Sequence, residues 1–256
     1  MNQDLQFGVT LFNLRDHCKT ESDLDTTLGR VRDIGYQNIQ VSGLGPIAPE
    51  KVRELADKHQ LNIVASHERG EGLRNNMADI IHKLKVWDCD FTALGSTSGV
   101  FDWKPESIPA LLNELESWGQ QLKDAGLKLG FHNHHQEFMQ FNGRTLIESI
   151  YSLPKDIMYA EIDVHWVQRG GANPVDWIYK VDGRMPVVHF KDFAIVDGEP
   201  RFCEIGEGNL DWKNIIKACK ETNVKYAIVE QDQPFGDKDI FDSMTISYDN
   251  LVAMGL

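Results

Sequence analysis

Short apolar runs alternate along the whole chain with longer segments whose apolar residues recur every three or four positions. The short runs, which are typical of strands, are residues 7–12, 38–41, 61–66, 91–94, 127–137, 159–166, 186–192 and 226–232. The segments with helical spacing are residues 22–34, 48–59, 77–87, 106–125, 145–152, 174–181, 212–222 and 239–254. Strands that are each followed by a helix predict a parallel sheet closed into a (β/α)8 TIM barrel.

The first helical segment illustrates the pattern. Leu24, Leu28 and Val31 recur at helical spacing, and Thr20 or Ser22 is available as the N-cap. The 256 residues suit one barrel domain, and no Pro-rich, Ser-rich or charged linker divides them. We therefore expect a single domain over residues 1–256. An open doubly wound sheet is the alternative, but no GxGxxG follows an early strand.

The net charge and the cysteine content indicate which classes of partner and which cellular compartment to expect. A formal net charge of -13 would repel nucleic acid and anionic membranes, and Lys and Arg form no cluster. No run approaches the roughly 20 apolar residues of a membrane span. The four cysteines are scattered without a CxxC pair, which indicates reduced thiols and a cytoplasmic protein. Exposed helices of such a barrel would permit a homodimer.

Imidazoles and carboxylates gather where the predicted strands end. In sequence order they are His67, His132, His134, Glu137, Asp163, His165, His189, Lys191, Asp192, Glu230 and Asp232. The alternation of a strand also places Glu161, Asp163 and His165 on one face. Because active sites of TIM barrels lie at the carboxyl ends of the strands, these groups predict one metal or acid/base site at the mouth. Two or three carboxylates with an imidazole suit Mn²⁺, Mg²⁺, Co²⁺ or Zn²⁺.

Several of these residues form short motifs that together resemble the sugar phosphate isomerase/epimerase family, whose fold is a xylose isomerase-like TIM barrel. The motifs are His132-Asn133-His134 with Glu137-Phe138, Glu161-Ile162-Asp163 with Trp166 and Gly170-Gly171, His189-Phe190-Lys191-Asp192, Gly206-Glu207-Gly208, Val229-Glu230-Gln231-Asp232 and Ser247-Tyr248. Each tripeptide alone is weak, but the ordered set is specific.

The resemblance implies one divalent metal ion, with Mn²⁺ the first choice, held by Glu137, Asp163, His189 and Glu230. Many relatives carry the first Glu within the strand, where this sequence has His132. Either Glu137 or His132 is therefore the first ligand. The family's chemistry is removal of a proton α to a carbonyl to form an enediolate, and its return at the same or the neighbouring carbon.

The remaining roles follow from this chemistry. Glu230 and Glu137 are candidate bases, with His134 or His132 as alternatives. Lys191 would stabilise the enediolate or form a structural ion pair with Asp163 or Asp192. The predicted substrate-binding residues are His67, His132, Trp166 and Glu207.

Four functions compete. The first is a metal-dependent isomerase or epimerase acting on a ketose or keto-sugar, and the second is a lyase or dehydratase on a keto-sugar, 3-keto-glycoside or inosose. An apurinic-site endonuclease would need further metal ligands and a basic groove. A non-catalytic sugar-binding barrel would tolerate loss of the metal ligands.

Overall fold

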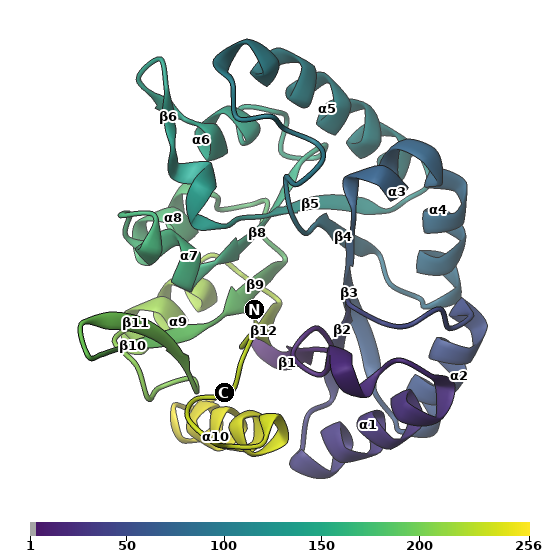
Figure 1. Ribbon diagram of the computed structural model, residues 1–256. Coiled ribbons are helices and arrows are strands. Elements are labelled where there is room, and N and C mark those ends of the chain that lie inside the picture. The colour runs from purple at the N-terminus through teal and green to yellow at the C-terminus, as the bar shows by residue number, and fades with distance from the viewer. Residues whose placement is uncertain (1–3) are drawn as a thin grey trace.

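Eight parallel strands close into a barrel in the computed structural model, which describes residues 4–256 (Figure 1). The barrel strands are β1 Gln6–Thr10, β2 Asn38–Val41, β3 Asn62–Glu68, β4 Phe91–Leu94, β5 Lys128–His132, β8 Tyr159–Asp163, β9 Val187–Phe190 and β12 Tyr226–Val229. Each pairs with the next along the chain, and β1 closes the ring by pairing in parallel with β12. The predicted TIM barrel is confirmed.

Helices surround the barrel and connect its strands (Figure 1). They are α1 Glu21–Ile34, α2 Pro49–Lys58, α3 Gly70–Asn75, α4 Met77–Val86, α5 Ile108–Asp124, α6 Leu146–Ile150, α7 Val164–Arg169, α8 Pro174–Lys180, α9 Trp212–Glu221 and α10 Ile240–Ala253. In α1 the N-cap is Thr20, whose side chain accepts from the backbone N–H of Asp23. Leu24, Leu28 and Val31 are buried, as their spacing predicted. Among residues 4–256, no helix combines the length and apolar character needed to cross a bilayer.

The barrel interior changes character along its axis. Toward the amino ends of the strands it holds an apolar cluster of Val64, Ala65, Phe91, Ala93, Val187 and Ile228. Gly130 on β5 leaves room for Phe91, because a Cβ there would lie 2.4 Å from the Phe91 ring. Toward the carboxyl ends the buried side chains become polar and charged. The apolar half stabilises the barrel and the polar half forms the candidate site.

The structure contains connections that the hydrophobic pattern did not predict. A hairpin of β10 Asp192–Val196 and β11 Glu199–Cys203 follows β9, and a smaller one of β6 Gln140–Phe141 and β7 Arg144–Thr145 follows β5. The predicted strand 159–166 is too long, since β8 ends at Asp163. The side chain of Asp163 then caps α7 by accepting from the backbone N–H of Trp166 at 3.0 Å. His165 therefore lies on a helix, and its expected placement on a strand face beside Asp163 is wrong.

Candidate active site

A hollow of about 680 Å³ opens at the carboxyl ends of the barrel strands. Phe12, Ser42, Gly95 and Ser96 line it from the loops that follow β1, β2 and β4. His67, His132, His134, Glu230 and Asp232 also face it. The strand ends thus meet at one mouth, and the space is large enough for a small molecule.

Four buried side chains at this mouth offer ligand atoms that all lie within 4.8 Å of one another. They are His132, Asp163, His189 and Glu230. One carboxylate oxygen of Asp163, Oδ2, is buried and has no hydrogen-bond partner within residues 4–256. A buried carboxylate oxygen without a partner is costly unless something else binds it.

This donor set fits a divalent cation. Two carboxylates and two imidazoles are hard and borderline ligands, which Mn²⁺, Fe²⁺, Co²⁺ and Zn²⁺ accept. Two formal negative charges match the charge of the ion. The structure therefore brings Asp163, His189 and Glu230 together as the resemblance implies, and it adds His132 as the fourth donor.

Glu137 does not join this group in the part of the chain that the structure describes. It lies in a short 3-10 turn, His135–Phe138, after β5. One carboxylate oxygen accepts from the Thr97 hydroxyl at 2.9 Å, and the other accepts from the backbone N–H of His134 at 2.7 Å. A ring nitrogen of His132 lies within the group of donor atoms and the Glu137 carboxylate does not, so the geometry favours His132 over Glu137 as the fourth member of the candidate set.

Asn133 fixes the two strand ends that carry His132 and Asp163. Its side-chain oxygen accepts from the backbone N–H of Asp163 at 3.0 Å, and its amide donates to the carbonyl of Asp163 at 3.4 Å. Asp163 Oδ1 in turn caps α7. The carboxylate is thus held at one oxygen, while Oδ2 points away from the helix cap and remains available.

A layer of polar side chains lies directly against the four donors. Gln40 on β2 donates through its amide to Glu161 at 3.0 Å, and its oxygen lies 2.5 Å from His189 Nε2. Since an amide oxygen can only accept, His189 carries a proton on Nε2 and turns Nδ1 toward Glu230, 2.5 Å away. Glu161 is fully buried and also contacts His67 Nε2 at 2.5 Å.

Gln40 was missed at the sequence level, and Glu161 was noted only as a neighbour of Asp163 on β8. A hydrogen bond from the metal-ligating imidazole to a second residue orients the ligand and strengthens its basicity. Glu161, His67, His132 and His189 also form a second group of ligand atoms within 4.8 Å. The two groups share His132 and His189, so the polar layer and the candidate metal site are continuous.

Lys191 is fully buried beside this group, 1% exposed. Its ammonium donates to Glu230 at 3.1 Å and to Asp232 at 2.7 Å, and not to Asp163 or Asp192 as considered from the sequence. The Trp166 ring lies 4.9 Å from the same nitrogen. Lys191 thus holds the Glu230 carboxylate from the side opposite His189.

Burial and neighbouring charges set the protonation of these groups. Burial would raise the pKa of Glu230, but Lys191 and His189 outweigh it and hold that pKa well below its usual range. Burial raises the pKa of Asp163 to about 7. Burial also lowers the pKa of His134 to about 4. At neutral pH the mouth therefore holds an ionised Glu230 beside a neutral His134.

The other predicted substrate-binding residues divide into two groups. His67 and His132 line the hollow, and Trp166 stands behind His134 with ring centroids 5.5 Å apart. Glu207 lies elsewhere, since its exposed side chain accepts from Asn250 of α10 at 2.9 Å. The geometry therefore does not support Glu207 as a substrate contact.

Asp192 explains this position of Glu207. Its carboxylate accepts from the backbone N–H of Gly206 and of Gly208, and from the Trp212 indole at 2.6 Å. A Cβ at position 208 would lie 2.2 Å from Asp192 Oδ1, so only glycine fits there. The Gly206–Gly208 turn is thus anchored by its backbone, with the intervening side chain outside.

The fold and the mouth define a class of protein. The chain belongs to the xylose isomerase-like TIM barrel family, whose model matches residues 28–244.

Individual relatives are more distant. An inosose dehydratase from Clostridium botulinum is 26% identical over 152 residues, which cover 53% of this chain and 50% of that protein. The match thus spans about half the length of this curated relative, and of a second inosose dehydratase from Clostridium beijerinckii at 24% identity.

Solved structures match the whole barrel. A sugar phosphate isomerase/epimerase from Parabacteroides distasonis superposes with a TM-score of 0.81 at 20% identity, covering 97% of this chain and 94% of that one. A probable 3-DHS dehydratase from Bacillus anthracis superposes with a TM-score of 0.73 at 12% identity, covering 97% and 99%. At these identities the likeness shows the fold.

Proposed function

We propose that the protein is a divalent-metal-dependent isomerase or epimerase acting on a ketose or keto-sugar by proton transfer at the carbon next to the carbonyl. One observation carries the proposal. Four buried candidate metal donors, one of them the ionised carboxylate of Glu230, lie together at a hollow large enough for a sugar. Mn²⁺ is the ion that we propose first, and the compartment that we propose is the cytoplasm.

The proposed metal site consists of His132, Asp163, His189 and Glu230. A divalent ion bound there would polarise a carbonyl and stabilise the negative charge that develops when the adjacent proton leaves. Gln40 accepts from Nε2 of His189 and so holds the ring with Nδ1 toward the site. Asn133 holds the strand ends in register, so the donors need little rearrangement.

Proton transfer falls to the protein's own side chains. Glu230 is ionised at neutral pH and would remove the α-proton. Lys191 donates to the same carboxylate and keeps it oriented. His134 also lines the hollow and, once protonated from solvent, would be the second group that exchanges a proton with the substrate. Proton return to the other face of the same carbon would give an epimer, and proton return to the neighbouring carbon would give an aldose or ketose isomer.

The second candidate is a dehydratase or lyase on an inosose, keto-sugar or 3-keto-glycoside. Two curated relatives are inosose dehydratases, at 26% and 24% identity. The first steps would be the same, and loss of a β-hydroxyl or β-alkoxy group would replace proton return. Glu230, protonated in the first step, would return its proton to the leaving oxygen, and His67 and His134, which both line the hollow, would hydrogen-bond to that oxygen.

One experiment separates the two and tests both. The protein, loaded with Mn²⁺, is incubated in D₂O with ketoses, 3-keto-glycosides and inososes. Deuterium at the α-carbon of a recovered sugar or its epimer supports the first function, and an unsaturated or shortened product supports the second. Absence of deuterium and of elimination with every substrate would count against both.

The variant Glu230→Gln tests the base directly. We expect loss of exchange by more than about 100-fold, the usual contribution of a general base. The matched control is Glu54→Gln, because Glu54 is exposed and pairs only with Lys51. An unchanged rate in Glu230→Gln would remove this residue from the mechanism.

A further inference from the structure

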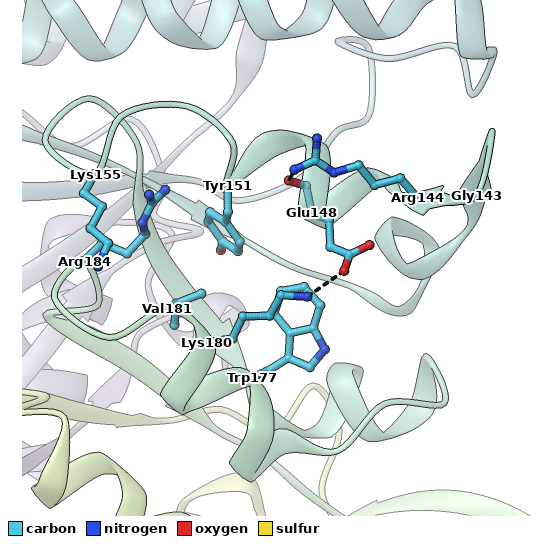
Figure 2. A pocket seen from close by; sticks show the side chains of 9 residues that line it. All are labelled: Gly143, Arg144, Glu148, Tyr151, Lys155, Trp177, Lys180, Val181 and Arg184. Carbon is cyan, nitrogen blue, oxygen red and sulfur yellow. Dashed lines mark hydrogen bonds and ion pairs between the residues drawn. The ribbon is translucent and has the colours of Figure 1, made fainter.

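A second hollow, of about 450 Å³, lies on the outer wall of the barrel between α6, α8 and the β6–β7 hairpin (Figure 2). Figure 2 shows Lys155 and Arg184 on one side of it and Arg144 and Glu148 on the other. No residue that lines this hollow lines the barrel mouth. We call it the outer-wall groove.

Four cationic side chains line the outer-wall groove, against one carboxylate. They are Arg144, Lys155, Lys180 and Arg184, and the carboxylate is Glu148. The groove thus has three positive charges in excess, whereas the whole chain has a formal net charge of -13. A local concentration of the minority charge around a concave surface raises the local concentration of small anions.

Only one of these cations is neutralised by a carboxylate within the described chain. Lys180 pairs with Glu148 at 2.6 Å, as the dashed line in Figure 2 marks. The other three donate to main-chain carbonyls, which satisfy hydrogen bonds but carry no net charge. Arg144 donates to the carbonyl of Glu148 at 2.7 Å, and Lys155 to that of Asp182 at 2.6 Å.

Arg184 is the most informative of the four. It is only 8% exposed, and its Nη1 donates to the carbonyls of Leu153 and Met158 at 3.2 and 3.3 Å. Within residues 4–256 its other nitrogens, Nε and Nη2, make no hydrogen bond, and neither is a fully buried atom, so both keep contact with solvent. Because Arg184 lines the groove, these donors are available to a ligand bound there. A buried guanidinium without a carboxylate is unusual, because buried charges are normally paired.

The walls of the groove hold these cations in place. Trp177 is 7% exposed, and the Lys180 ammonium lies 4.4 Å from its ring centre. Tyr151 donates through its hydroxyl to the carbonyl of Phe131 on β5 at 3.1 Å, so its ring is anchored to the barrel. Because these side chains are already held in place, binding of a ligand would cost little conformational entropy.

We propose that the outer-wall groove is a binding site for a small phosphorylated molecule, separate from the active site. A phosphate group carries close to two negative charges and matches the planar fork of an arginine. The free donors of Arg184 supply such a fork beside Lys155 on one side of the groove, and Arg144 lies on the other side (Figure 2). The volume accommodates a phosphate with a small organic substituent. This site does not depend on the proposed catalytic function.

Calorimetric titration of the full chain with pyrophosphate and with inorganic phosphate tests the proposal, at constant ionic strength. We expect saturable binding, tighter for pyrophosphate because it carries more charge. Lys155→Gln and Arg144→Gln should each weaken binding about tenfold, since each removes one charge-assisted hydrogen bond. Both residues are exposed and bond only to carbonyls, so the variants should fold.

The control is Lys217→Gln, which removes the same charge from an exposed position on α9. Arg184→Gln should abolish binding, and the two exposed variants keep the test valid if it fails to fold. Equal weakening in the control would show general electrostatics only and would overturn the proposal, as would absence of binding to the native protein.

Sedimentation with vesicles that contain a phosphoinositide tests whether the bound phosphate belongs to a lipid headgroup. Capture by vesicles, lost in Lys155→Gln, would assign the groove to a lipid headgroup and overturn the assignment to a free small molecule.

Discussion

The two halves of the barrel mouth differ in kind. The ends of β1 to β4 and the loops after them contribute most of the lining of the hollow, with small side chains such as Ser42 and Gly95 and charged ones such as Arg15, Glu68 and Arg69. The ends of β5, β8, β9 and β12 contribute the four candidate metal donors and fewer lining residues. One half of the mouth thus provides most of the space, and the other provides the candidate metal donors.

This division indicates how a substrate would enter. Its bulk would occupy the side of the first four strands, and its carbonyl end would point toward Asp163 and Glu230. Changes in the second half should then affect metal binding and turnover, whereas changes in the first half should affect substrate affinity. The following expectations test that division, from the largest effect to the smallest.

Asp163→Asn should have the largest effect. Asparagine can still cap α7 through its oxygen, so the fold should persist, but the free carboxylate oxygen is lost. We expect divalent-metal affinity to fall by more than about 100-fold. Loss of a residue that only hydrogen-bonds to a metal ligand already lowers metal affinity by about 10- to 100-fold, and loss of a ligand should cost more. Competition with a chelating dye measures it. Asp156→Asn, at an exposed carboxylate that pairs with Lys123, is the control. Unaltered affinity would place the metal elsewhere.

Glu137 joins the two halves, since it accepts from Thr97 after β4 and from the N–H of His134 after β5. Burial raises its pKa from 4.5 to about 6. The folded state therefore holds this proton more tightly, and the contribution of Glu137 to stability is lost as pH rises from 4.5 through 6.

Glu137→Gln should remove that dependence. Relative to this variant, the native protein should lose about 2 kcal/mol of unfolding free energy across this window. Urea denaturation at a series of pH values measures the difference, with metal removed from both proteins. Parallel pH profiles would mean that Glu137 titrates normally.

Gln40→Leu should have an intermediate effect, although Gln40 belongs by sequence to the first half. It removes the acceptor of His189 Nε2 and one donor to Glu161. We expect metal affinity to weaken about tenfold. In the metal-free protein the nitrogen-15 shift of His189 Nε2 should change, because this nitrogen loses its hydrogen bond to Gln40. Unchanged shifts and affinity would mean that Gln40 contributes only to packing. Gln121→Leu, on the surface of α5, is the matched control.

Phe12→Ala should have the smallest effect and a different signature. Phe12 lines the open half and lies under the Arg15 guanidinium at 4.5 Å. We expect KM to rise on the order of threefold to tenfold, the value of one aromatic contact, with kcat unchanged. Met139→Ala, at an exposed apolar residue outside the hollow, is the control. A fall in kcat at constant KM would break the proposed division.

Much of the fold could be read from the chain, because the spacing of apolar residues is a local property. The run 91–94 and the run 38–41 are strands with the predicted limits, since each is bounded by turn residues and buried on both faces. The hairpin of residues 192–203 was not predicted, because it lacks such a local pattern. It is held by pairing between β10 and β11 and by packing near Trp166, not by a strong periodicity of its own.

The candidate site divides in the same way. That Asp163, His189 and Glu230 would share one mouth followed from the sequence, because parallel strands all end at one edge of a barrel. The first donor did not follow. His132 and Glu137 are five positions apart, and only the 3-10 turn between them, with the bond to Thr97, turns Glu137 away from the other donors.

The sequence by itself determined the barrel and the kinds of side chain that gather at its mouth, since these depend on residue type and on periodicity within one element. The tertiary structure decided which side chains touch. Gln40 meets His189 across 149 positions and Glu161 across 121, and the four cations of the outer-wall groove meet only where α6 and α8 flank the same strand. Such contacts depend on how the sheet closes, which no local pattern encodes.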